Sequence, residues 1–310
     1  MDKNPILITG SHRSGSTWVG RVIESCNQIS YYAEPMNPNI KINRFIFEYK
    51  IPKLWFPAID YLNDTAYLRG YKRILNGHFP LKELFPRNLK ELKYFLTLNY
   101  KAFTKKRVLL KDPISLFSSE WIYDNFDTLN IVLIRGPEAF ISSLKKNKWT
   151  FNFNNLLKQN DLIDKFFFEY KDDIELFSKK NDIDIIDQGI LLWNIIHTYI
   201  YLMIIKNPNW YFVSHEALSK KPILEFKKIF QYLNLDFDDK VIEYINKTTN
   251  SNNPSERLSE KVHVLERNSK ENIYTWRKRL TKDEIEKINI GTKNVHKKLS
   301  NFLLSNQVLN

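Results

Sequence analysis

The sequence predicts an α/β fold in three layers, with helices on both faces of a central parallel sheet. Four short runs rich in leucine or β-branched residues are expected to be strands, because each is followed by a turn and then a helical pattern. These runs are residues 5–9, 107–111, 130–134 and 210–214. The chain has 310 residues, a length that fits a single domain, residues 1–310, carrying one helical insertion.

The first predicted strand leads into the loop GSHRSGST, residues 10–17, and then into a helical stretch that begins at Trp18. Backbone N–H groups of such a turn, together with a helix N-terminus, bind phosphate groups. The glycines have the spacing of the ATP-binding pattern G-x-x-x-x-G-K-[ST], but Ser16 replaces its lysine and a cation appears earlier, at Arg13. We therefore expect a shorter anion than ATP. The alternative is a turn that only caps the helix.

Glu34, followed by Pro35, comes after the first helix and a short strand-like run. This return of the chain brings Glu34 toward the phosphate loop and makes it our first candidate for a catalytic base. Burial beside Tyr32 is expected to raise its pKa. The alternative is a glutamate in a surface turn before proline.

Residues 40–105 are predicted to form a helical, aromatic-rich insertion that roofs the active site. It contains His78, the second candidate base, because histidine titrates near neutral pH. A lone histidine in an aromatic loop is more often structural. The aromatic side chains of the insertion stack on sugar rings or form the insertion's own core; they are Phe45, Phe47, Tyr49, Trp55 and Phe56.

Two further predicted strands end in cations. Lys111 ends the second run and is expected to assist a leaving group. Arg135 follows the third run, and Ser143 lies eight residues later on a predicted helix. Ligands of parallel sheets bind at the carboxyl ends of the strands. Eight residues are about two helical turns, so both side chains can face one crevice. Taken alone, the pair would be an ordinary sheet-edge arginine and a solvated serine.

The second half of the chain is mostly helical in pattern. The apolar run 190–205 is shorter than the ~20 residues of a membrane span and is expected to be a buried helix. Residues 248–280 are predicted to form a mobile loop beside the donor and acceptor sites. Helices are expected at 282–290 and from there to 304, the first capped by Thr281 and Glu284.

Composition limits the partners. The formal net charge is +12, which favours anionic ligands, but the basic residues are scattered and predict no nucleic-acid stripe. The single cysteine, Cys26, excludes an intrachain disulfide and a cysteine-based metal site. No signal-peptide pattern is seen, so we expect a soluble cytoplasmic protein that requires no metal.

The loop at residues 10–18 resembles the 5′-phosphosulfate loop of sulfotransferases that use 3′-phosphoadenosine 5′-phosphosulfate (PAPS). That family carries a basic residue followed by Ser-Gly-[Ser/Thr]-[Thr/Ser]. By resemblance, the 5′-phosphosulfate is held by Arg13, Ser14, Gly15, Ser16 and Thr17, with Trp18 next in the motif. The family also has an arginine and a serine with the spacing of Arg135 and Ser143, which bind the 3′-phosphate. It usually has aspartate where this chain has Gly136.

Other matches are weaker. Trp276 and Arg277 resemble the family's C-terminal donor loop, and Arg267 and Ser269 lie just before it. Glu34-Pro35 is similar to a Glu-Pro of carbohydrate sulfotransferases, in which the glutamate is the proposed base.

The resemblance implies an enzyme that transfers the sulfuryl group of PAPS to an acceptor hydroxyl on a saccharide or glycoconjugate and releases 3′-phosphoadenosine 5′-phosphate (PAP). Two alternatives stay open. A nucleotide-dependent kinase would use the segment Val108–Asp112 as a strand ending in a magnesium-binding aspartate. A non-catalytic protein would bind acidic glycans or nucleic acid through the +12 charge.

Overall fold

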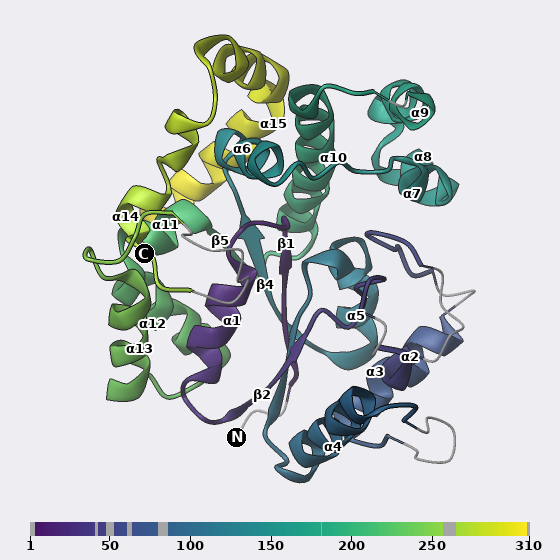
Figure 1. The fold of residues 1–310 in the computed structure, drawn as a ribbon, viewed down its shortest axis with the longest axis vertical. Helices are drawn as coiled ribbons and strands as arrows, with labels where there is room; N and C mark the ends of the chain where they lie inside the picture. Colours follow the sequence, from purple (N-terminus) through teal and green to yellow (C-terminus); the bar gives the residue numbers. More distant parts are fainter. Residues whose placement is uncertain are drawn as a thin grey trace.

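A five-stranded parallel sheet forms the centre of the molecule (Figure 1). The computed structural model describes residues 4–40, 43–47, 53–60, 64–79, 86–180, 182–256 and 265–308. The strand order is β2-β3-β1-β4-β5, and every pairing is parallel. The strands are β1 (Ile6–Gly10), β2 (Ile29–Ala33), β3 (Arg107–Lys111), β4 (Leu129–Ile134) and β5 (Tyr211–Ser214). The predicted α/β fold is confirmed, and β2 is the strand-like run that precedes Glu34.

Side chains of the strands alternate between two cores because successive residues point to opposite faces. Ile6 and Ile8 pack on one face with α1 (Ser16–Glu24), α12 (Pro222–Leu233) and α13 (Asp239–Thr249). Leu7 packs on the other face, where the 3₁₀ helix η2 (Pro113–Ser118) and α5 (Ser119–Phe126) lie. Helices therefore cover both faces, as Figure 1 shows.

A third core joins the end of β4 to helices α6 (Pro137–Asn147), α10 (Ile185–Lys206) and α15 (Lys282–Val308). By length and composition α10 could span a membrane, but 67% of its most apolar window is buried inside the fold. It is the core helix that the apolar run predicts. Four smaller helices precede it; they are α7 (Asn154–Leu157), α8 (Asn160–Phe166), η3 (Phe168–Tyr170) and α9 (Lys171–Lys179).

The insertion contributes α2 (Arg44–Phe47), α3 (Thr65–Asn76) and α4 (Leu89–Phe103). Phe45, Phe47 and Phe56 are fully buried, so they form core rather than a sugar-stacking surface. Tyr49 lies outside the described residues. Residues 53–60 cross toward the phosphate loop, where Phe56 packs against His12 with ring centroids 5.6 Å apart.

Helix α11 (His215–Lys220) follows β5. The predicted loop at residues 248–280 contains two short helices, α14 (Ser269–Asn272) and η4 (Thr275–Lys278), and its residues 257–264 lie outside the described part. The two helices predicted at 282–290 and to 304 are one continuous helix, α15. Its predicted start is confirmed, because Glu284 accepts from the N–H of Thr281 and Thr281 accepts from the N–H of Glu284.

Candidate active site

The phosphate loop starts where β1 runs against β4. Gly10 has φ +118°, and a Cβ at this position would lie 2.3 Å from the carbonyl oxygen of Leu133. The next residue, Ser11, donates its N–H to that same oxygen at 3.1 Å. Only glycine fits this conformation and this close approach. The strand therefore turns immediately at its carboxyl end, where ligands of parallel sheets bind.

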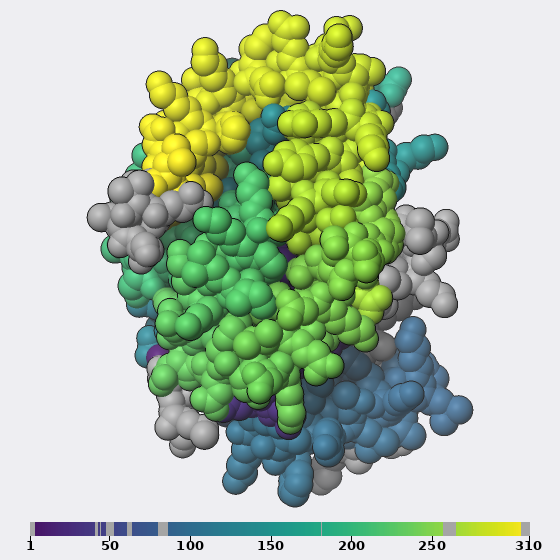
Figure 2. Space-filling view, turned by 90° about the vertical axis from the view of Figure 1, so that its left-hand side faces the viewer, coloured from purple at the N-terminus to yellow at the C-terminus, as the bar shows by residue number. Residues whose placement is uncertain are grey.

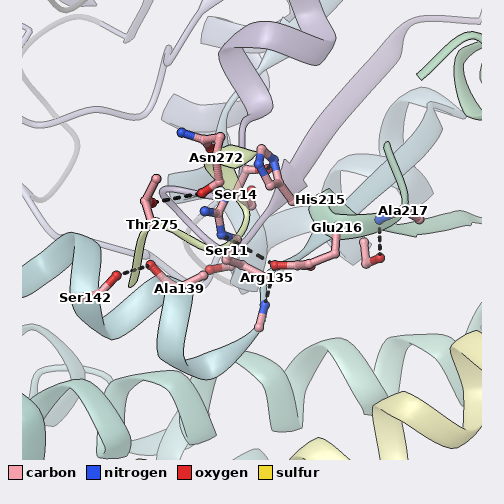
Figure 3. Close-up of polar contacts among 12 residues, drawn as sticks. Ser11, Ser14, Arg135, Ala139, Ser142, His215, Glu216, Ala217, Asn272 and Thr275 are labelled. Carbon is pink, nitrogen blue, oxygen red and sulfur yellow. Dashed lines mark hydrogen bonds and ion pairs between the residues drawn. The ribbon is translucent and has the colours of Figure 1, made fainter. Parts of the chain in front are cut away.

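The second glycine of the loop is fixed by a histidine at the start of α11, directly after β5. Gly15 has φ +88°, and a Cβ there would lie 2.6 Å from Nδ1 of His215. That nitrogen is 3.0 Å from the carbonyl oxygen of Ser14, as seen in Figure 3. Since a carbonyl only accepts, Nδ1 carries the proton. Burial lowers the pKa of His215 well below its usual value, which keeps the ring neutral.

The start of α1 is open to an anion. Gly15 is the N-cap and has no side chain to bind the first N–H groups of the helix. The hydroxyl of Ser14 is buried and has no hydrogen-bond partner among the described residues. Unsatisfied donors at a helix N-terminus are the usual phosphate site of such folds. The open N-cap and the unpartnered Ser14 hydroxyl are the geometry expected of a loop that binds a phosphate group.

Arg13 connects the two predicted donor motifs. Its Nε donates to Oγ of Ser143 on α6 at 2.9 Å, and its guanidinium lies 5.0 Å from the ring centroid of Trp149. The residue before it, His12, is held by Phe140 at a centroid distance of 4.8 Å. Burial and the adjacent Arg13 charge lower the pKa of His12 to about 3. His12 is therefore a neutral anchor, and Arg13 supplies the positive charge.

Arg135 lies at the carboxyl end of β4, as the sequence predicts, and its ion-pair partner is Glu216, whereas Ser143 contacts Arg13. Nε of Arg135 is 3.7 Å from Oε1 of Glu216, an ion pair too long for a hydrogen bond. The same oxygen accepts the N–H of Gly136 at 3.2 Å. Figure 3 shows this contact between β4 and the start of α11. The Arg135 guanidinium is buried, and burial lowers its pKa.

Two residues of α10 fix the backbone of Arg135. Trp193 donates its indole N–H to the carbonyl of Arg135 at 2.9 Å, and His197 Nε2 lies 3.5 Å from the N–H of Arg135. The two rings are stacked with centroids 4.1 Å apart. His197 Nδ1 bonds the carbonyl of Trp193, so Nε2 is the accepting nitrogen. Burial lowers the pKa of His197 to about 3.

The sequence carries no signal for the contacts that these supporting residues make. His197 and His215 each stand alone in their motifs and are 62 and 201 residues from the groups they contact. Only the fold brings α10 and α11 to the ends of β1 and β4. A polar side chain inside an otherwise apolar helix was the one available hint for His197.

A cavity of about 270 Å³ opens beside Arg135. It lies between the N-terminus of α6, α11, η4 and α15, and Figure 2 shows the corresponding hollow between the green α11 and the yellow C-terminal helix. Glu216, Lys220, Trp276 and His296 contribute to its lining. Arg135 therefore faces a space that a ligand group can enter.

The four residues predicted to form the C-terminal part of the donor site make different contacts in the structure. Arg267 donates its N–H to the carbonyl of Thr248, whose hydroxyl accepts from the indole of Trp18. Ser269 binds the carbonyl of Ser219 on α11. Trp276 lines the cavity beside Arg135. Arg277 instead stacks on Tyr274 with its guanidinium 4.8 Å from the ring centroid.

Glu34 and Lys111 form an ion pair at the carboxyl ends of β2 and β3. Nζ of Lys111 lies 2.5 Å from Oε1 of Glu34. The aliphatic part of the Lys111 side chain packs beside Gly20 of α1, where an added Cβ would lie 3.5 Å from Cγ of the lysine. Burial favours the neutral acid, but the Lys111 charge and hydrogen bonds from Lys111 and Asn37 outweigh it and lower the pKa of Glu34. The prediction of a raised pKa was wrong, because the lysine lies closer than the sequence reveals.

His78 is not brought to this group of residues. It is exposed and follows the end of α3, donating its N–H to the carbonyl of Arg73. A Cβ on the preceding Gly77 would lie 2.3 Å from Cβ of Ala102. Ala102 lies shortly before the start of β3, near the amino ends of the strands, whereas the phosphate loop lies at their carboxyl ends. The structure thus gives His78 no contact with the proposed catalytic groups.

These features define a class: an α/β protein whose glycine loop at a helix N-terminus lacks the ATP-type lysine and has arginines beside it. Residues 125–302 match the sulfotransferase domain family. The match covers more than half of the chain, which therefore belongs to this family. The phosphate loop and Glu34 precede the matched segment. No curated protein matches the sequence.

Two solved structures are similar to this chain, and the first of them supports the fold. A sulfotransferase domain from the curacin biosynthetic pathway is 15% identical, with a TM-score of 0.51, covering 94% of this chain and 98% of that one. A mouse sulfotransferase, SULT7A1 complexed with PAP, is 13% identical, with a TM-score of 0.43, covering 98% of this chain and 90% of that one. At these identities the likeness of the first establishes the fold alone.

Replacing Gly15 tests the loop geometry. Gly15→Ala forces a side chain into a left-handed conformation, at about 1–2 kcal/mol, and against His215. We expect affinity for an anionic nucleotide to fall by about tenfold or more, measured by isothermal titration. Gly77→Ala is the matched control, because Gly77 also has a positive φ, +64°, but lies at the end of α3, away from the loop, so nucleotide affinity should be unchanged. Equal affinity of Gly15→Ala and wild type would contradict the assigned geometry.

Proposed function

We propose that this sulfotransferase takes its sulfuryl group from PAPS and transfers it to a hydroxyl of a saccharide or glycoconjugate. The observation that carries the donor assignment is the hydrogen bond from Arg13 to Ser143. It joins a phosphate loop without the ATP-type lysine to the second motif that the family resemblance assigns to the donor. Family membership supplies the reaction class, and the +12 charge suits an anionic donor.

The residues present fit this donor. Ser14 has a buried hydroxyl without a partner, and Arg135 has a buried Nε without a hydrogen bond, among the described residues. Buried polar atoms of this kind are usually satisfied by a ligand or water. The loop N–H groups and Arg13 would hold the 5′-phosphosulfate, and Arg135 the 3′-phosphate. PAPS supplies the sulfuryl group and leaves as PAP.

Glu34 is the proposed general base. Its lowered pKa keeps the carboxylate ionised at neutral pH, which is the form that accepts a proton from an acceptor hydroxyl. Its side chain is 27% exposed, so an acceptor can reach it. Lys111 holds one carboxylate oxygen and Asn37 the other. In our proposal the lysine both orients the base and brings positive charge to the carboxyl edge of the sheet.

The saccharide class is supported by the Glu34-Pro35 resemblance. Aromatic stacking adds little, because Phe45, Phe47 and Phe56 are core residues. Trp55 is partly exposed and lies in the segment that crosses toward the phosphate loop. An acceptor screen with labelled PAPS, covering saccharides, phenols, lipids and peptides, tests this part separately from donor use.

The kinase alternative loses its proposed metal ligand. Asp112 is fully buried and accepts the N–H groups of Met36 at 2.6 Å and of Ile114 at 3.1 Å. Burial raises the pKa of Asp112 to about 7. The carboxylate thus caps η2 and fixes the turn after Glu34, which is a structural role.

Thermal denaturation tests the donor. PAP at about a hundred times its Kd should stabilise the protein by about 2.7 kcal/mol without Mg²⁺. Arg135→Ala should weaken PAP binding roughly ten- to a hundredfold, since a hydrogen bond to a charged group contributes about 1.5–3 kcal/mol. Arg69→Ala, an exposed arginine of α3, is the control. Stabilisation by Mg-ATP alone would instead favour the kinase.

Replacing the base separates chemistry from binding. Glu34→Gln should reduce kcat by about 100-fold or more, because general-base catalysis contributes typically ~10²–10⁴-fold. PAP affinity should be unchanged. The control is Glu243→Gln on the exposed face of α13. Near-normal turnover of Glu34→Gln would place the base elsewhere.

The pH profile tests the role of Lys111. Turnover should fall as pH drops through the lowered pKa of Glu34, because protonation removes the base. Lys111→Met removes the charge that lowers this pKa and leaves burial to raise it, so the acidic limb of kcat should move to higher pH. Lys111→Arg keeps the charge and should leave the limb near its wild-type position. An unmoved limb in Lys111→Met would show that Glu34 is not the titrating group.

A further inference from the structure

Helix α4 carries an apolar stripe on its solvent face. Its members are exposed by between 41% and 84%; they are Leu89, Leu92, Leu96, Tyr100 and Phe103. Their spacing of three or four residues places them on one side of a helix. A shallow groove along this side is lined by four of them together with Lys93 and Thr97. Isolated exposed hydrophobic residues are ordinary, but a continuous row on one helix marks an interaction surface.

The stripe is not the packing face of the helix. Phe95 and Leu98, on the other side of α4, are 5% and 1% exposed and belong to the core of the insertion. Asn88 caps the helix by accepting the N–H of Glu91. Lys101 donates to the carbonyl of Tyr31 on the edge strand β2. The helix is thus anchored by one apolar face and presents a second one to solvent.

The charges around the stripe are mostly positive. Residues 87–106 contain six cationic side chains and a single carboxylate, Glu91. Lys90 and Lys93 are exposed and make no ion pair among the described residues. Self-association would bring the lysines of two copies together with one glutamate from each. A stripe of leucine and aromatic residues beside lysines is instead the pattern of helices that lie on anionic membranes.

We propose that α4 docks on the surface of an anionic lipid bilayer, with its stripe among the acyl chains and its lysines at the head groups. The stripe is about 21 Å long at 1.5 Å per residue, enough to lie flat in the interface. In Figure 2 the blue α4 segment projects at the lower end of the molecule. The helix ends just before β3 begins, near the amino ends of the strands, and the phosphate loop lies at their carboxyl ends. Docking therefore leaves the donor loop facing the aqueous phase.

Vesicle sedimentation tests this surface directly. The full chain should pellet with vesicles of phosphatidylcholine containing a quarter phosphatidylglycerol, and far less with phosphatidylcholine alone or in high salt. The double variant Leu92→Glu/Leu96→Glu should lose binding at least tenfold. Lys90→Gln and Lys93→Gln should each weaken it roughly fivefold, because a lysine near an anionic surface contributes about that factor. Ile290→Glu on α15, a residue 69% exposed, is the matched control and should bind as wild type.

Each variant is checked for an unchanged unfolding midpoint, and Leu96→Gln replaces the double variant if that one fails to fold. The proposal is overturned if the wild-type chain ignores anionic vesicles, or if the stripe variants bind them as well as Ile290→Glu does. A dimer in sedimentation velocity that Leu96→Gln dissociates would assign the stripe to a second copy of the chain and also overturn it.

Discussion

The hydrogen bond between the His215 imidazole and the carbonyl of Ser14 holds the phosphate loop in its shape. It links the loop just before Gly15 to the residue that follows β5, in addition to the pairing of β1 with β4 and of β4 with β5. The loop residues on either side depend on the same restraint. Arg13 has the strained φ of +65° that a non-glycine residue adopts only when its surroundings impose it. His215 supplies that restraint from one side, and the Phe56 and Phe140 rings around His12 supply it from the other.

A second set of contacts does the same for Arg135. The backbone of Arg135 is held by Trp193 and His197 of α10, and the next N–H by Glu216 of α11. Both arginines that we propose as anion ligands are therefore held at the carboxyl ends of the strands by contacts from neighbouring elements. Such support is what positions charged groups accurately enough for group transfer. The buried Arg135 guanidinium is 3.7 Å from Glu216, too far for a hydrogen bond. In our proposal its Nε is therefore available to hydrogen-bond a phosphate of the donor.

Local patterns in the sequence were sufficient for four of the five strands, because these are short runs dominated by apolar residues. The fifth, β2, contains Ser30 and two tyrosines and was recognised only as a strand-like run. The spacing of Gly10, Gly15 and Arg13 likewise revealed the loop without any tertiary information. Contacts across long sequence separations could not be read this way. The pairing of Arg13 with Ser143, the ion pair of Lys111 with Glu34 and the histidine supports all arise from strand order. The lowered pKa of Glu34 follows from that order too, since β2 and β3 become neighbours only in the folded sheet.

The histidines beneath the loop have one more consequence. His12 and His197 have pKa values near 3, and that of His215 is well below its usual value, so all three rings stay uncharged across the range in which cells live. The floor of the anion cradle is then electrically constant. These three side chains therefore keep the same charge when the surroundings become mildly acidic. In our proposal, acidity then acts on turnover through Glu34 and not through the residues that pack against the loop.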